Sequence, residues 1–129
     1  MATITEDYVS FEVAKLLNVK GFKGEFHKHY WGYEAGKEFL TESSFNPEYD
    51  YPAPTLQMAM KWLREVHNLF IEIVVGETEG KTWYDYDIIP INGKVIYWKE
   101  LDVPPPVIEC NTPEEAIEIG LKYCLENLI

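Results

Sequence analysis

Apolar and polar positions along residues 55–75 follow two different periods, and together they predict a helix that runs directly into a strand. Thr55 is a favourable N-cap residue, and Asn68 can end the helix. Residues 69–75 are too short and too rich in β-branched side chains for a second helix, so they predict a buried strand. The apolar face of the helix is expected to hold Leu56, Ala59, Met60, Leu63, Val66 and His67.

Residues 69–98 carry the pattern of three antiparallel strands. A polar turn is expected at residues 76–80, and Asn92-Gly93 is a strong hairpin signal before a further strand at Val95–Trp98. The middle strand alternates between two faces. Its inward face is expected to hold Tyr84, Tyr86 and Ile88, and its outward face Trp83, Asp85 and Asp87.

Two more helices flank this centre. Ser10 caps a short helix over about residues 10–19, and Thr112 opens the last helix with Pro113 at its first position and Glu115 completing a capping box. Gly120 costs about 1 kcal/mol relative to alanine inside a helix, so we expect it to lie close to an aromatic residue of the sheet.

The segments between these elements are less regular. Residues 22–50 are aromatic and punctuated by glycines, which predicts short strands or an ordered loop. Residues 41–54 read as loop, and prolines 47, 52 and 54 prevent a helix from starting before Thr55. Pro104-Pro105-Pro106 predicts an extended connector. Residues 1–129 therefore predict one small α+β domain, a three- to four-stranded antiparallel sheet with two to three helices packed on one face.

Charge narrows the possible partners. The 129 residues include 22 acidic and 11 basic side chains, a net charge of −11, of which −10 falls in residues 41–129. Such a field repels nucleic acid and anionic membranes, and it also promotes solubility. Residues 1–129 contain no apolar run of membrane-spanning length and no secretory signal, so we expect a cytoplasmic protein. Cys110 and Cys124 are expected to be free thiols rather than a disulfide or zinc ligands.

Candidate binding residues gather in the basic aromatic segment at residues 20–37. Lysines interleaved with aromatic side chains are typical of single-stranded nucleic-acid binding, whereas exposed tyrosine and tryptophan also favour protein interfaces. A packed aromatic hairpin is the plainer explanation. The candidate binding residues are Lys23, His27, Lys28, His29, Tyr30, Trp31 and Tyr33.

Catalytic and metal chemistry have weaker signals. An extended segment would place His27 and His29 on one side together with Glu25, which could form a metal site, but surface histidines are the favoured interpretation. Asp85 and Asp87 could likewise bind a cation, although a solvated sheet face explains them. No nucleophile elbow, phosphate loop or dinucleotide motif occurs, so an enzyme is the less favoured class and no cofactor is expected.

Three blocks of sequence carry a family resemblance: S-F-E-V-A-K-L-L near the start, Y-P-A-P-T-L-Q-M-A-M-K-W-L-R-E-V-H-N in the centre and P-E-E-A-I-E-I-G-L-K near the end. In this order they resemble a family of small uncharacterised proteins encoded in phages, prophages and mobile elements of gut Bacteroidetes. The resemblance implies a phage-associated, intracellular protein and transfers no functional residue.

These observations favour a non-enzymatic interaction protein that binds another protein, in one version as an acidic mimic of nucleic acid. The alternatives are single-stranded nucleic-acid binding through residues 20–37 and a small metal-dependent enzyme that uses His27 and His29. A homodimer is compatible with the composition, but the pattern shows no seam.

Overall fold

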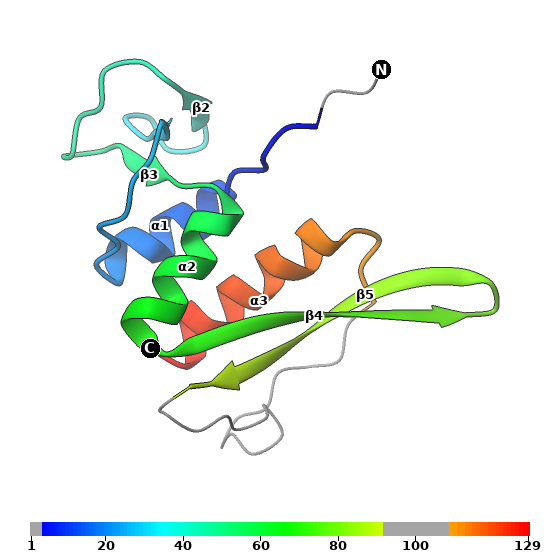
Figure 1. Ribbon diagram of the computed structural model, residues 1–129. Coiled ribbons are helices and arrows are strands. Elements are labelled where there is room, and N and C mark those ends of the chain that lie inside the picture. The colour runs from blue at the N-terminus through cyan, green and yellow to red at the C-terminus, as the bar shows by residue number, and fades with distance from the viewer. Residues whose placement is uncertain (1–3, 92–108) are drawn as a thin grey trace. The chain divides into compact units, whose positions relative to one another are not determined.

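The computed structural model describes residues 4–91 and 109–129. Its strands form two antiparallel sheets, one with the order β2-β1-β3 and one made of β4 and β5, and helices accompany both (Figure 1). The α+β class is therefore confirmed. The chain divides into two compact units, Met1–Ala59 and Met60–Ile129. The elements are α1 (Phe11–Val19), β1 (Lys28–Trp31), β2 (Phe39–Thr41), β3 (Tyr51–Ala53), α2 (Leu56–His67), β4 (Leu69–Thr78), β5 (Lys81–Pro90) and α3 (Pro113–Asn127).

Helix α1 follows the predicted caps. The hydroxyl of Ser10 accepts a hydrogen bond from the Val13 backbone N–H at 3.2 Å, and Gly21 adopts φ +86° just after the helix end. That left-handed position favours glycine and stops the helix. The buried residues of α1 are Val13, Ala14 and Leu17, and the helix packs against β3.

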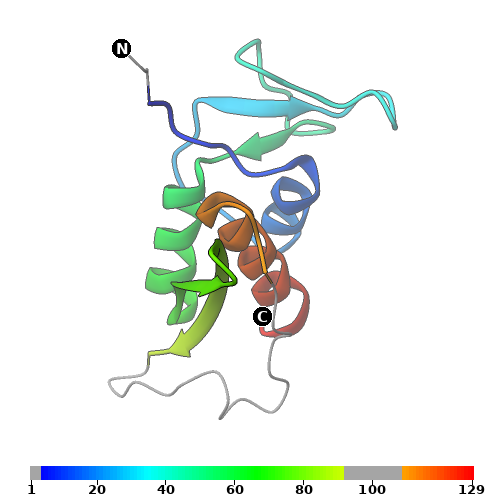
Figure 2. The same ribbon diagram turned by 90° about the vertical axis from the view of Figure 1, so that its right-hand side faces the viewer.

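Strand β3 overturns the prediction that residues 41–54 are all loop. Tyr51–Ala53 pairs antiparallel with β1, as Figure 2 shows by the opposed arrows. Pro52 lies opposite His29 in this pairing. Because β3 is an edge strand, the missing N–H of the proline is tolerated there.

Helix α2 begins and ends where the sequence predicts. Thr55 Oγ1 accepts a hydrogen bond from the Met58 N–H at 3.2 Å, and Asn68 ends the helix with φ +57°. The buried face was predicted one residue too long, because Val66 in the last turn is 56% exposed. His67 is half-buried with its ring edge-on to Trp62 at 4.7 Å between centroids.

The β4–β5 hairpin is longer than predicted. Its turn is only Glu79-Gly80, both with positive φ, so the prediction of a turn at residues 76–80 is wrong for the first three of them. Gly76 lies within β4 opposite Trp83, and the indole of Trp83 lies against it, where a Cβ would overlap the ring. The indole N–H donates a hydrogen bond to Thr78 Oγ1 at 2.9 Å, and this bond holds the ring against Gly76.

Helix α3 packs on the inner face of this hairpin. Thr112 Oγ1 accepts from the Glu115 N–H at 3.1 Å, as a capping box requires. A Cβ on Gly120 would lie 3.2 Å from Tyr86 Cδ2 and 3.3 Å from Ile71 Cγ2, so the predicted approach to an aromatic residue is confirmed. Tyr86 is buried beneath the helix, as predicted for the inward face.

The rest of the predicted meander falls outside the described residues, namely the Asn92-Gly93 turn, the Val95–Trp98 strand and the Pro104-Pro105-Pro106 connector. Strand β5 instead pairs with Cys110. Tyr84 donates its N–H to the Cys110 carbonyl at 2.9 Å and accepts in return at 2.7 Å. Cys110 and Cys124 are buried free thiols. No helix in the described ranges is long and apolar enough to cross a membrane.

Candidate binding site

The alternation of β1 divides the predicted binding residues between two faces of the first sheet. Trp31 lies opposite Phe39 of β2, and His29 lies opposite Thr41 of the same strand. Since neighbouring strand residues point to opposite faces, Lys28 and Tyr30 lie on the other side from His29 and Trp31.

The face that carries Lys28 and Tyr30 serves the fold. Tyr30 donates its hydroxyl to the Val9 carbonyl at 2.7 Å, and Phe11 of α1 meets the Tyr30 ring edge-on at 5.6 Å between centroids. Lys28 Nζ lies 4.9 Å above the centre of the Tyr8 ring, within cation–π range. Both predicted binding residues are therefore committed to contacts within the unit.

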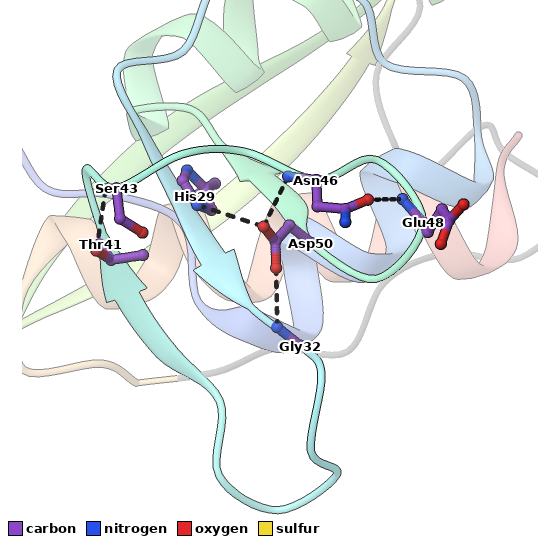
Figure 3. A network of polar contacts seen from close by, with 7 residues as sticks. All are labelled: His29, Gly32, Thr41, Ser43, Asn46, Glu48 and Asp50. Atoms are coloured by element: carbon purple, nitrogen blue, oxygen red, sulfur yellow. Dashed lines mark hydrogen bonds and ion pairs between the residues drawn. The ribbon is translucent and has the colours of Figure 1, made fainter.

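The opposite face holds a buried polar pair. His29 and Asp50 are 2% and 3% exposed, and His29 Nε2 lies 3.5 Å from Asp50 Oδ2 without hydrogen-bond geometry (Figure 3). The carboxylate is compensated by two backbone donors, the Asn46 N–H at 2.8 Å and the Gly32 N–H at 3.3 Å. Phe45 covers the imidazole edge-on at 5.3 Å between centroids. His29 is thus enclosed and does not face solvent.

Through its two backbone hydrogen bonds, Asp50 connects the turn at residues 46–50 to the end of β1. Gly32 is required at this junction, because a Cβ there would overlap the carbonyl oxygen of Tyr49. A buried carboxylate bonded to backbone N–H groups fixes both segments, since losing it would leave those donors unsatisfied. Asp50 therefore positions Tyr49 beside the residues that follow β1.

Beyond this pair, four aromatic rings form a continuous row, which we call the aromatic row: Phe39, Trp31, Tyr33 and Tyr49. Phe39 stacks on Trp31 with 5.3 Å between centroids, and Trp31 contacts Tyr33 at 5.9 Å. Tyr33 meets Tyr49 edge-on at 5.0 Å. Tyr33 is 66% and Phe39 52% exposed, so the row presents aromatic surface to solvent.

The charged side chains beside the aromatic row carry a net negative charge. Lys37 Nζ lies 3.0 Å from the Glu34 carboxylate, so this lysine is already paired. Glu38 accepts the Gly36 N–H at 3.0 Å, and that backbone hydrogen bond lowers the pKa of its carboxyl. The lowered pKa favours the ionised form of Glu38, and the formal charges of the connection between β1 and β2 sum to one negative charge.

The two predicted binding residues that precede β1, Lys23 and His27, are exposed. Their segment precedes the strand, so His27 does not share a strand face with His29 as the metal-site hypothesis requires. Within the described residues, no group of three or more histidine, cysteine or acidic side chains is placed to hold a metal ion.

Two members of the aromatic row, Trp31 and Tyr33, were among the predicted binding residues, whereas Phe39, Tyr49 and Asp50 were not. A signal for Phe39 was present, because the glycine-containing stretch at residues 32–36 can turn the chain and place it opposite Trp31. Tyr49 and Asp50 arrive through tertiary contacts in a segment that reads as loop. Comparisons of the chain with protein-family models, curated proteins and solved structures found no match.

Proposed function

We propose that the protein is a binding protein that uses the aromatic row to recognise another protein. The observation that carries this proposal is the exposure of Tyr33 and Phe39 within a packed row of four rings. Aromatic side chains offer large contact areas at low conformational-entropy cost and are enriched at interfaces. Exposed apolar surface rimmed by charged groups is typical of such sites.

The internal support of the row strengthens the proposal. Trp31 is half-buried between Phe39 and Tyr33, and Asp50 fixes the backbone of Gly32 between Trp31 and Tyr33. A pre-organised surface loses less conformational entropy when a partner binds. His29 takes no part in the exposed surface, which favours binding over chemistry at this site.

The partner is expected to be a protein of the cell in which this protein is made. Association with a phage or mobile element is also part of the proposal. The acidic-mimic version draws on the second unit, where Glu72 lies opposite Asp87 on the outward face of the hairpin and Asp85 follows along it. Three carboxylates on one face suit a basic partner better than an evenly scattered charge would.

Removing the row should abolish partner capture. We expect the double substitution Tyr33→Ser and Phe39→Ser to lose proteins that the tagged wild type retains from a lysate of the encoding organism, read by mass spectrometry. Both side chains are largely exposed, so the fold should persist. The matched control is Val66→Ser, which removes an apolar side chain of 56% exposure from α2. Equal capture by the double variant and the wild type would refute the proposal.

Single-stranded nucleic-acid binding is the second candidate, favoured by the stacked Trp31 and Phe39 rings. The charges argue against it, because Lys37 is paired and the adjoining acids repel phosphate. We expect a flat fluorescence-anisotropy titration with labelled single-stranded oligonucleotides at low salt. A saturable rise that the Tyr33→Ser and Phe39→Ser variant lacks would replace protein recognition by nucleic-acid binding.

A further inference from the structure

In the β4–β5 hairpin, residues whose backbone groups bond to the other strand alternate with residues whose backbone groups point away from it. Contacts at the two ends of the hairpin show which residues belong to which set. At the open end, the Ile91 N–H donates to the Asn68 carbonyl at 2.6 Å. At the closed end, the two-residue turn makes Thr78 and Lys81 the hydrogen-bonded closing pair. In an antiparallel ladder every second residue bonds to the partner strand. The backbone N–H and C=O groups of the even-numbered residues of β4 therefore form hydrogen bonds with β5.

The outward groups of β5 confirm this phase. Tyr84, which lies opposite Val75, forms hydrogen bonds with the backbone of Cys110 through both its N–H and its C=O group. Tyr86, which lies opposite Ile73, donates its N–H at 2.7 Å to the Asp85 carboxylate rather than to β4. The odd-numbered residues of β4 must then direct their N–H and C=O groups away from β5.

These outward groups of β4 form an open edge. Across residues 4–91 and 109–129, no backbone hydrogen bond reaches Ile71, Ile73 or Val75 from outside the hairpin. Because Ile71 is only 5% exposed, the accessible sites for strand pairing along this side of the sheet are the outward backbone groups of Ile73 and Val75. An edge of this kind is a template for an added strand.

The side chains around this edge specify what should pair with it. On the inner face, beyond the cover of α3, Val75 is 63% exposed, and Figure 1 shows the turn end of the hairpin extending past that helix. On the outer face, Glu72 lies directly opposite Asp87, and Asp85 follows two residues along. In the described part of the chain none of these three carboxylates forms an ion pair. Like charges directly opposite each other destabilise a sheet.

We propose that the β4 edge binds an extended segment of a partner protein as an additional strand. The segment carries β-branched side chains opposite Ile73 and Val75, and a lysine or arginine opposite Glu72. The apolar side chains would cover the exposed part of the inner face at Val75, and the cation would relieve the repulsion between Glu72 and Asp87. This site belongs to the unit Met60–Ile129 and does not depend on the aromatic row.

Hydrogen exchange of the free protein tests the open edge first. We expect the amides of Ile73 and Val75 to exchange quickly and those of Glu72 and Val74 slowly, because only the latter two bond to β5. Uniformly slow exchange along residues 71–75 would mean that the edge is already paired, and it would overturn the proposal.

The peptide T-V-K-I-K-V-T, acetylated and amidated, tests binding. Paired antiparallel with its isoleucine opposite Ile73, it places valines opposite Ile71 and Val75 and a lysine opposite Glu72. We expect it to shift the amide NMR signals of these residues and to saturate. Failure of the wild-type protein to bind this peptide would overturn the proposal.

Two variants make the binding test specific. Val75→Pro removes only an outward N–H, so it should keep the hairpin and lose the peptide, while Val75→Thr keeps the N–H and should bind. Glu72→Lys should weaken binding about tenfold and prefer the peptide with glutamates in place of lysines. Unchanged affinity of Glu72→Lys for both peptides would refute the charge pairing even if Val75→Pro fails to fold.

Discussion

The substitution Asp50→Ala is expected to destabilise the protein by about 3 kcal/mol, since two backbone N–H groups lose a charged acceptor and each such loss costs about 1–3 kcal/mol. The donors are Gly32 and Asn46, and the Asp50 side chain that joins them is almost fully enclosed. Urea unfolding followed by circular dichroism measures the change. The same variant should bind a partner of the aromatic row more weakly, because Gly32 separates Trp31 from Tyr33.

The matched control is Asp50→Asn, which keeps one carbonyl oxygen in the same place. It should retain one of the two backbone hydrogen bonds and lose less stability than Asp50→Ala. His29→Phe, which removes the imidazole and leaves both backbone bonds, should likewise cost less. If Asp50→Ala unfolds at the same urea concentration as the wild type, the carboxylate does not hold the turn at residues 46–50.

This ranking follows from how Asp50 is compensated. Two backbone N–H groups donate hydrogen bonds to its side chain, whereas the imidazole lies at 3.5 Å without hydrogen-bond geometry. A buried carboxylate left without donors would be costly, so the turn and the strand end stay together. The order of the aromatic row is therefore a consequence of a buried polar contact beneath it.

Elements specified by local chemistry could be predicted from the sequence. Thr112 and Glu115 define the start of α3, and Thr55 and Asn68 define both ends of α2. Each of these signals acts within four residues, where capping preferences operate. The inward position of Tyr86 was also predicted, because strand alternation has a fixed period of two.

Elements specified by tertiary contacts could not be predicted from the sequence. Nothing local marks Tyr51–Ala53 as a strand, since it contains a proline and pairs only because β1 offers an edge. Gly76 reads as a turn residue until Trp83 is known to cover it. His29 reads as a surface ligand until Asp50 and Phe45 enclose it. The candidate binding residues were therefore predicted as one continuous segment, whereas the rings of the aromatic row come from β1, from β2, from the connection between them and from the turn before β3.

The Cys124 thiol should make the protein lose stability at alkaline pH. Burial on the inner side of α3 raises the pKa of this thiol from 9.0 to about 12. The unfolded chain therefore releases its proton first, so the stabilising effect is complete below about pH 9 and is lost as the pH rises toward 12. The difference between the two pKa values corresponds to about 4 kcal/mol. Urea unfolding at intervals between pH 7 and pH 11 measures the decline.

Cys124→Ala separates this thiol from the other groups that titrate nearby. It removes one buried sulfur, so it should cost about 1 kcal/mol at neutral pH, yet its stability should fall less steeply above pH 9. Tyr86 still contributes in the variant, because burial is the largest cause that raises the pKa of its hydroxyl, and only the second cause, the neighbouring Cys124, is removed. Cys110→Ala is the matched control, and it should keep most of the wild-type decline. Parallel pH profiles for Cys124→Ala and the wild type would show that Cys124 ionises as easily in the folded protein as in the unfolded chain.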